Sequence, residues 1–258
     1  GGGGLQPQLP AEVGGGAQGA GGQREAAGTE QLAELLDTDF RLGGAELSYA
    51  SDIDVIFVYD GSTASDFAVA ERTATRLVGA IGDSTSEGRT FRVDTRLRPE
   101  GNQGPLARSL GGYRAYFEQW AQTWEFQALT KARFVAGDTA LGARFVELAQ
   151  DFVYRDPFLE EWRRDVRRMK ARIESERIPP GEDPQFHLKL GRGSLSDVEW
   201  TVQLLQLTHG VRATGTMEGL DRLLASGLMD PTEHAVLAGA YRFCELTRNR
   251  LFLLRGAP

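Results

Sequence analysis

The sequence LGGAELSYASDIDVIFVYDG, residues 42–61, decides the fold because it joins a glycine pair to two acids and an apolar run. Its second half, DIDVIFVYD, is rich in β-branched and aromatic residues and stops before a glycine, which predicts a buried strand. Side chains two residues apart in a strand leave the same face, so Asp52 and Asp54 are expected to point together. Carboxylates that close repel each other, and a divalent cation is the usual remedy. The motif therefore predicts a metal site.

A short loop precedes these acids and is suited to phosphate binding. Gly43 and Gly44 let the backbone approach a phosphate closely and present bare N–H groups to it. Ser51, immediately before Asp52, adds a hydroxyl donor. We therefore predict that the two glycines and the serine contact a nucleotide.

A second strand is predicted in RTFRVDTRLRPEG, residues 89–101, where apolar and polar side chains alternate with a period of two. This alternation places Asp94, Arg96 and Arg98 on one face, beside the acid pair of the first strand. Three acids arranged in this way can bind two Mg²⁺ ions, and Asp94 can also draw the proton from an attacking hydroxyl. The two arginines would neutralise a triphosphate.

The remaining segments have the 3.6-residue period of helices. One helix is predicted at residues 65–82, between the two strands, and a short one at residues 30–36. After the second strand, helical patterns separated by Gly and Pro occupy residues 113–135, 140–153, 160–177, 197–210, 217–227 and 231–254. The predicted fold class is α+β, with a sheet domain at 31–110 followed by an α-helical bundle at 111–258. Residues 1–30, rich in Gly and Ala, are predicted to be disordered.

Composition excludes several classes of protein. Of 258 residues, 41% are hydrophobic and 25% charged, and no apolar run approaches the roughly 20 residues that a membrane span needs. The net charge of -7 argues against general binding of nucleic-acid phosphates and against a polymerase-like enzyme. The single cysteine, Cys244, lies in a helical pattern and is predicted to be a buried apolar residue. Three scattered histidines do not suggest zinc, and no secretory leader is expected, so we predict a cytoplasmic location.

A second glycine-containing motif, GRGSLSDVEW at residues 191–200, could be taken for a phosphate loop. It lacks the G-K-[ST] ending of such a loop and no predicted strand precedes it. Residues 196–199 are predicted instead to form a capping box that opens the next helix. Lys189 and Arg192 stay candidates for contacts to a nucleotide or a protein substrate.

Two helical segments have unusual composition. Aromatic side chains at helical spacing in residues 113–126 are predicted to pack in a core rather than to stack on bases. Close to them, Glu125, Lys131 and Arg133 are candidates to face the catalytic sheet. Residues 160–177 alternate in charge at helical spacing, which predicts a solvated, ion-paired face that could also dock a partner protein.

The arrangement of the glycine pair, the S-D-I-D motif and the apolar strand resembles the nucleotidyltransferase superfamily that includes DNA polymerase β. Three blocks are more narrowly similar to the bifunctional glutamine synthetase adenylyltransferase/adenylyl-removing enzyme family: LGGAELSYASDIDVIFVYD, VDTRLRPEGNQGPLARSLGGYRAYFEQWAQTWEFQALTKARFVAGD and HLKLGRGSLSDVEWTVQLLQLTHG. The resemblance covers residues 41–258, and it implies a DNA polymerase β-like nucleotidyltransferase sheet domain before the bundle.

The family combines two such halves, and this chain is most similar to the C-terminal, adenylylating half. The resemblance implies Mg²⁺-dependent transfer of AMP from ATP to a tyrosine hydroxyl of glutamine synthetase, with a PII-type nitrogen-signalling protein as a further partner. It assigns catalysis and metal binding to Asp52, Asp54 and Asp94, and nucleotide contact to Gly43, Gly44 and Ser51. Two alternatives stay open: phosphorolytic removal of AMP from adenylylated glutamine synthetase, and a non-catalytic regulatory module that binds nucleotide or partners. The second is favoured by the segment before Gly43, which departs from the family pattern.

Overall fold

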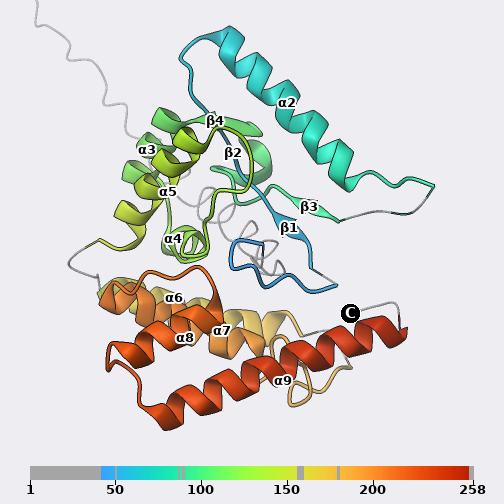
Figure 1. The fold of residues 1–258 in the computed structure, drawn as a ribbon, viewed down its shortest axis with the longest axis vertical. Coiled ribbons are helices and arrows are strands. Elements are labelled where there is room, and N and C mark those ends of the chain that lie inside the picture. The colour runs from blue at the N-terminus through green and yellow to red at the C-terminus, as the bar shows by residue number, and fades with distance from the viewer. Residues whose placement is uncertain are drawn as a thin grey trace, which may run out of the picture.

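The computed structural model describes residues 42–49, 51–86, 88, 91–155, 160–178 and 181–255. The predicted disordered segment at 1–30 and the predicted helix at 30–36 lie outside the described residues. Figure 1 shows two groups of elements, with the strands and α2–α5 in one and α6–α9 in the other. The predicted combination of a small sheet with many helices is confirmed in this coarse form.

The described strands are short, and they pair in parallel as two separate two-stranded sheets. They are β1 (Ile53–Asp54), β2 (Phe57–Tyr59), β3 (Val93–Asp94) and β4 (Ala107–Ser109). β1 pairs with β3, whereas β2 pairs with β4. The single strand predicted for DIDVIFVYD is therefore wrong in detail, because the chain changes pairing partner after Asp54.

The second predicted strand ends early. The alternation of residues 91–98 predicted a longer element, but only Val93 and Asp94 are in β3. The backbone N–H of Arg98 donates to the carbonyl of Thr95 at 3.3 Å, so the chain turns directly after the strand. Pro99 follows and has no N–H to donate to a sheet.

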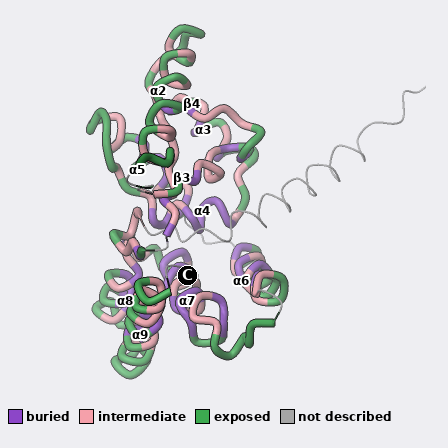
Figure 2. The backbone as a smooth tube through the Cα atoms, turned by 90° about the vertical axis from the view of Figure 1, so that its right-hand side faces the viewer, coloured by how far each residue is buried: buried purple, intermediate pink, exposed green. Residues whose placement is uncertain are grey.

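Four helices accompany the strands: α2 (Ala64–Gly82), α3 (Leu110–Gln119), α4 (Thr123–Leu129) and α5 (Thr139–Val153). Thr63 and Asp66 form a capping box at the start of α2, and these hydrogen bonds lower the pKa of Asp66. In α2 only Ala74 is buried, and Figure 2 shows this helix as exposed or half-buried over nearly all its length. The single helix predicted at 113–135 is interrupted between α3 and α4.

The first hydrophobic core joins the sheet to the helices that follow it. Its buried members are Tyr113, Phe117, Phe126, Phe145, Leu148, Ala149, Val153, Trp162 and Leu207, and Ile56 and Val58 of the strand region pack against them. The prediction that the aromatic segment packs in a core is confirmed, although Trp120 is 57% exposed. Because α3–α5 share this core with β2, the predicted division at 110/111 does not coincide with a gap in packing and stays a prediction.

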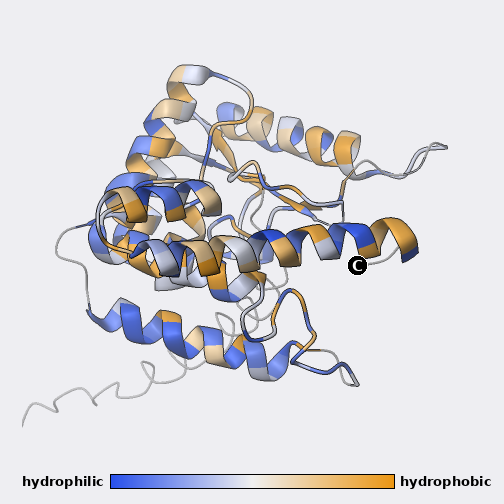
Figure 3. Ribbon diagram, turned by 60° about the horizontal axis from the view of Figure 1, so that its bottom comes forward, coloured by the Kyte–Doolittle hydropathy of each residue, from blue (hydrophilic) through white to orange (hydrophobic). Residues whose placement is uncertain are grey.

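The second group contains α6 (Glu160–Glu176), α7 (Leu195–His209), α8 (Thr216–Ala225) and α9 (Pro231–Arg255). Its main core combines residues of α7, α8 and α9, and Cys244 is buried there as predicted. Figure 3 shows α6 as largely hydrophilic. The predicted ion-paired face is present on it, with Lys170–Glu174 at 2.5 Å and Arg172–Glu176 at 3.0 Å.

The capping box predicted for residues 196–199 is wrong, because α7 starts two residues earlier than predicted, with Ser194 as its N-cap. The acids of the motif have other partners. Asp197 accepts from the backbone N–H of Gly193 at 2.6 Å, and Glu199 forms an ion pair with Lys131 at 3.6 Å. Among the described residues, no helix is both long and apolar enough to cross a membrane.

Candidate active site

The pairing of β1 with β3 brings two of the predicted acids together. Asp54 and Asp94 are register partners in these parallel strands, and the N–H of Val55 donates to the carbonyl of Asp94 at 2.9 Å. Neighbouring strands are about 4.8 Å apart, and paired residues direct their side chains to the same face. Asp52 lies just before β1, two residues from Asp54. Asp54 and Asp94 therefore lie side by side on adjacent strands, as the two motifs predicted, whereas Asp52 lies outside the strand.

The acids differ in burial and in partners. Asp94 is 7% exposed, and its carboxylate accepts from Arg96 Nε at 3.0 and 2.9 Å, from Arg96 Nη2 at 2.5 Å and from the backbone N–H of Arg96 at 2.8 Å. Asp52 lies 3.6 Å from the exposed guanidinium of Arg92. Both carboxylate oxygens of Asp54 are buried. A buried carboxylate pair is costly unless cations compensate it, and at Asp94 that cation is Arg96.

The donor chemistry of this pair is that of a Mg²⁺ site, since Mg²⁺ prefers carboxylate oxygens. However, the described residues contain no group of three or more His, Cys, Asp or Glu side chains gathered closely enough to hold a metal ion. Both Asp94 oxygens are occupied by Arg96. Asp54 and Asp94 thus face each other, and a metal ion can bind Asp94 only after Arg96 has left it.

The predicted glycines are packed against protein. A Cβ added at Gly43 would lie 1.8 Å from the carbonyl oxygen of Lys131, and one at Gly44 would lie 3.0 Å from that of Thr214. Ser51 is buried, and its hydroxyl lies 2.6 Å from that of Ser48. The close approach that requires glycine here is an approach to the chain's own backbone, and nucleotide contact by these three residues stays a prediction.

Arg98 lies in the turn after β3 and binds the backbone there. Its guanidinium donates to the carbonyl and hydroxyl of Thr95, both at 2.7 Å, and to the carbonyl of Gly104 at 3.2 Å. Partial burial lowers the pKa of this guanidinium. Arg98 therefore stabilises the turn after β3. The prediction that Arg98 shares a face with Asp94 assumed a strand that continues to residue 98, but β3 ends at Asp94.

Glu46 was not predicted from the sequence, and Lys131 and Arg133 were only candidates to face the catalytic sheet. Glu46 Oε2 lies 3.3 Å from Lys131 Nζ, and Arg133 donates to the carbonyls of Leu42 and Gly43 at 2.7 and 2.9 Å. The segment after α4 thereby holds residues 42–49, the glycine loop. The sequence contains a weak signal for this, since Lys131 and Arg133 are cations directly after an apolar helix.

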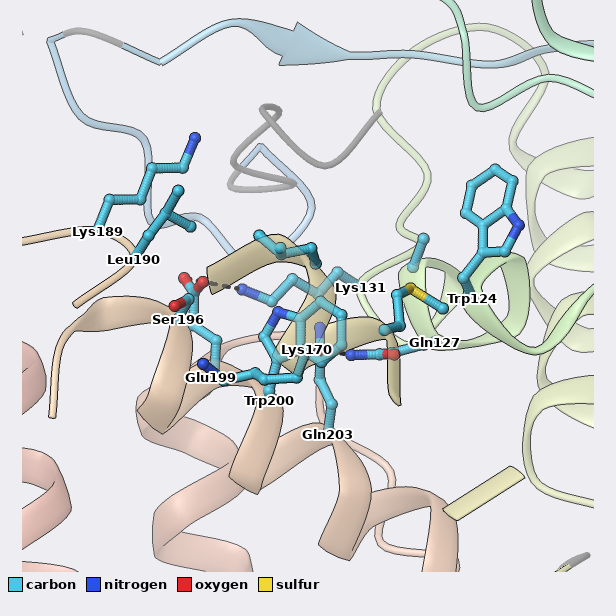
Figure 4. Close-up of a pocket in the computed structure, with 13 residues that line it drawn as sticks. Trp124, Gln127, Lys131, Lys170, Lys189, Leu190, Ser196, Glu199, Trp200 and Gln203 are labelled. Atoms are coloured by element: carbon cyan, nitrogen blue, oxygen red, sulfur yellow. Dashed lines mark hydrogen bonds and ion pairs between the residues drawn. The ribbon is translucent and has the colours of Figure 1, made fainter. Parts of the chain in front are cut away.

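A cavity of about 50 Å³ lies between α4, α6 and α7, close to this segment. Figure 4 shows Lys131 and Gln127 entering it from the first group of elements and Glu199, Trp200 and Gln203 from α7. Lys189, a predicted contact residue, also lines it. Gln127 donates to Gln203 across the cavity at 2.8 Å. The cavity therefore lies between the two groups of elements and is lined by residues of both.

Glu125, at the start of α4, is buried beside the first core. It accepts from the hydroxyl of Tyr116 at 2.8 Å and from the backbone N–H of Gln122 at 2.7 Å. Burial raises the pKa of Glu125 to about 7, although both hydrogen bonds oppose the shift.

This shift makes stability depend on pH with a definite sign. Between the usual carboxyl pKa of 4.5 and about 7 the folded protein keeps the Glu125 proton that the unfolded chain has lost. The folded state binds more protons in that window, so the free energy of unfolding that Glu125 contributes falls as the pH rises through it. We expect the melting temperature of Glu125→Gln to fall less than that of the parent from about pH 5 to about pH 8. Parallel curves for the two proteins in thermal unfolding would contradict this expectation.

Comparison with known proteins divides the chain into two regions. Residues 40–148 match the family described as glutamate-ammonia ligase adenylyltransferase. Residues 165–258 match the family described as GlnD PII-uridylyltransferase. The two regions correspond closely to the strand-containing group of elements and to the group of α6–α9.

Curated relatives are bifunctional glutamine synthetase adenylyltransferase/adenylyl-removing enzymes. The chain is 46% identical over 227 residues to that of Mycobacterium avium (strain 104), covering 84% of this chain and 23% of the relative. For the enzyme of Mycobacterium tuberculosis (strain ATCC 25618 / H37Rv) the identity is 47% over 227 residues, with the same coverage. For that of Streptomyces avermitilis it is 45% over 225 residues, covering 84% and 22%. The chain thus spans less than a quarter of the length of these relatives.

Proposed function

Because the chain belongs to the family of glutamine synthetase adenylyltransferase/adenylyl-removing enzymes, we propose that it transfers AMP from ATP to a tyrosine hydroxyl of glutamine synthetase. The observation that supports this most directly is the register pairing of Asp54 with Asp94, with Asp52 two residues away. Facing carboxylates at the ends of short parallel strands are what a metal–triphosphate complex needs.

In this reaction the tyrosyl oxygen attacks the α-phosphorus of ATP. The new bond is P–O to tyrosine, the bond to the β-phosphate oxygen breaks, and pyrophosphate leaves. Asp94 accepts the hydroxyl proton, and Arg96, which now holds Asp94, turns to the triphosphate charge. Asp54 and Asp94 would hold Mg²⁺, with Asp52 as a third ligand once it is drawn closer to them than in this structure, and the ion would supply charge stabilisation of the phosphates when bound.

The test is incubation of the protein with ATP labelled on the α-phosphate and with unmodified glutamine synthetase. Label should appear on glutamine synthetase in the presence of Mg²⁺ and should fall to background when EDTA removes the metal. A tyrosine-to-phenylalanine variant of glutamine synthetase at the labelled position should not be modified. Absence of label at every divalent-metal concentration, with a protein that is folded by circular dichroism, would refute the proposal.

A second candidate is suggested by the adenylyl-removing activity that the names of the relatives include. In that reaction phosphate attacks the same α-phosphorus and tyrosine is the leaving group, so ADP is released. Adenylylated glutamine synthetase and inorganic phosphate are the substrates for this assay, and ADP is its readout. A binding module without turnover would instead give calorimetric ATP binding and neither product.

The match of residues 165–258 to a PII-uridylyltransferase family suggests the partner of the second group of helices. We propose that a PII-type signalling protein modulates AMP transfer. Addition of such a protein to the labelling assay should change the initial rate, whereas the same amount of serum albumin should not.

A further inference from the structure

Lys131 is a buried cation that contacts three other parts of the chain. It is 6% exposed, and its ammonium lies 3.3 Å from Glu46 Oε2, 3.6 Å from Glu199 Oε1 and 3.2 Å from the hydroxyl of Thr216. Figure 4 shows it between α4 and α7, directed towards Glu199. Glu46 belongs to the glycine loop, Glu199 to α7 and Thr216 to α8. Burying a cation is costly, and the two carboxylates that contact this ammonium offset that cost.

Glu46 also binds the start of α8. Its Oε1 accepts from the backbone N–H of Thr216 at 2.6 Å and from that of Met217 at 3.3 Å, while Oε2 accepts from the Thr216 hydroxyl at 3.0 Å. The N-cap of α8, Gly215, has no side chain to do this. A carboxylate at a helix N-terminus interacts favourably with the free N–H groups and with the helix dipole.

The glycine loop is thus attached at two points to the segment after α4. Arg133 binds the carbonyls at its start, and Lys131 binds Glu46 in its middle. The loop then leads through Ser51 into the acid pair of β1. Within the described part of the chain, the loop is therefore held by the start of α8 and by the segment after α4, in addition to the turns within the loop itself.

We propose that Lys131 is a positioning residue for nucleotide binding, acting through Glu46 on the loop that precedes Asp52. This inference rests on the proposed function, since it assigns the loop to the triphosphate. Loss of the Lys131–Glu46 contact leaves a buried acid uncompensated and lets the loop leave the helices. A displacement of about 1 Å in a phosphate-binding loop is enough to weaken binding strongly.

Two variants test the contact between Lys131 and Glu46. Glu46→Gln keeps the shape of the side chain and its bond to the start of α8, and Lys131→Met removes the cation. Both should raise the KM for MgATP by about tenfold or more. Lys131→Arg keeps the charge, so its KM should be close to that of the parent. Glu199→Gln is the matched control, because it weakens the contact of Lys131 with α7 and leaves the loop attached. Its KM should change by less than about twofold.

The readouts separate positioning from folding and from the proposed reaction. A merely structural role would lower the melting temperature and the active fraction of Glu46→Gln, Lys131→Met and Glu199→Gln and leave KM unchanged. That result, or an equal rise of KM in Glu199→Gln, would overturn the inference. Calorimetric binding of MgATP is measured in parallel with AMP transfer. If the parent binds MgATP but does not modify glutamine synthetase, the proposed function fails, and the binding constants of the variants still decide the role of Lys131.

Discussion

Asp54→Asn should lower the rate of AMP transfer to glutamine synthetase by about a thousandfold or more, without lowering the stability of the fold. Asparagine has the shape of aspartate and lacks its charge, so it fits the same position in β1 but binds Mg²⁺ poorly. Its register partner is Asp94, and removal of one of two adjacent like charges relieves repulsion between them. The melting temperature should therefore stay the same or rise while activity is lost. Initial rates with labelled ATP and a thermal unfolding curve measure the two effects.

The control for this variant is Asp60→Asn, directly after β2. Asp60 pairs with Arg144 at 2.7 Å, and both side chains are more than half exposed. An exposed ion pair contributes little to stability, about 0–1 kcal/mol, and this one lies outside the acid pair. Asp60→Asn should keep normal transfer rates. If Asp54→Asn retained more than about a tenth of the activity, Asp54 would not hold the metal of the reaction.

The helices of this protein are largely predictable from its sequence because they are amphipathic. The periods of residues 140–153 and 217–227 correspond to α5 and α8 within a few residues. In both, apolar side chains at helical spacing are the buried ones, so a local pattern and the tertiary core agree. The strands are less predictable, since two or three residues carry too little alternation to define an element. β4 contains no β-branched residue and follows a loop that contains glycine and proline. Its pairing with β2 joins residues that are far apart in the sequence.

The candidate site was predictable to the extent that it consists of acids in strands. Asp54 and Asp94 were placed together by period-two reasoning, which works because strand pairing aligns side chains on one face. Arg98 was misplaced because a turn after β3 cancels that alternation. Glu46 and Lys131 could not be paired in advance, since a contact between a loop and a helix end has no local signature. Such contacts form only when the helices pack against one another in the folded protein.

Gly43→Ala should reduce both stability and activity, and more strongly than a surface substitution does. The added Cβ would lie 1.8 Å from the carbonyl oxygen of Lys131 and 2.9 Å from its carbonyl carbon. Both atoms belong to the backbone, so no side-chain rotation relieves the overlap, and the loop has to move away from the end of α4. Arg133 would then lose its bond to the Gly43 carbonyl. We expect the free energy of unfolding to fall by about 3 kcal/mol, as for severe overpacking, with a loss of MgATP affinity.

Gly111→Ala is the matched control, because it adds the same methyl group where space exists. Gly111 lies in α3, and an added Cβ would meet no atom of another part of the chain within 4 Å. Alanine is favoured over glycine in a helix by up to about 1 kcal/mol, so this variant should be as stable as the parent or more so. Chemical denaturation of the two variants compares the effects directly. Equal stability of Gly43→Ala and Gly111→Ala would mean that the loop is not held against Lys131, and the assignment of Gly43 to a phosphate loop open to solvent would then become the better explanation.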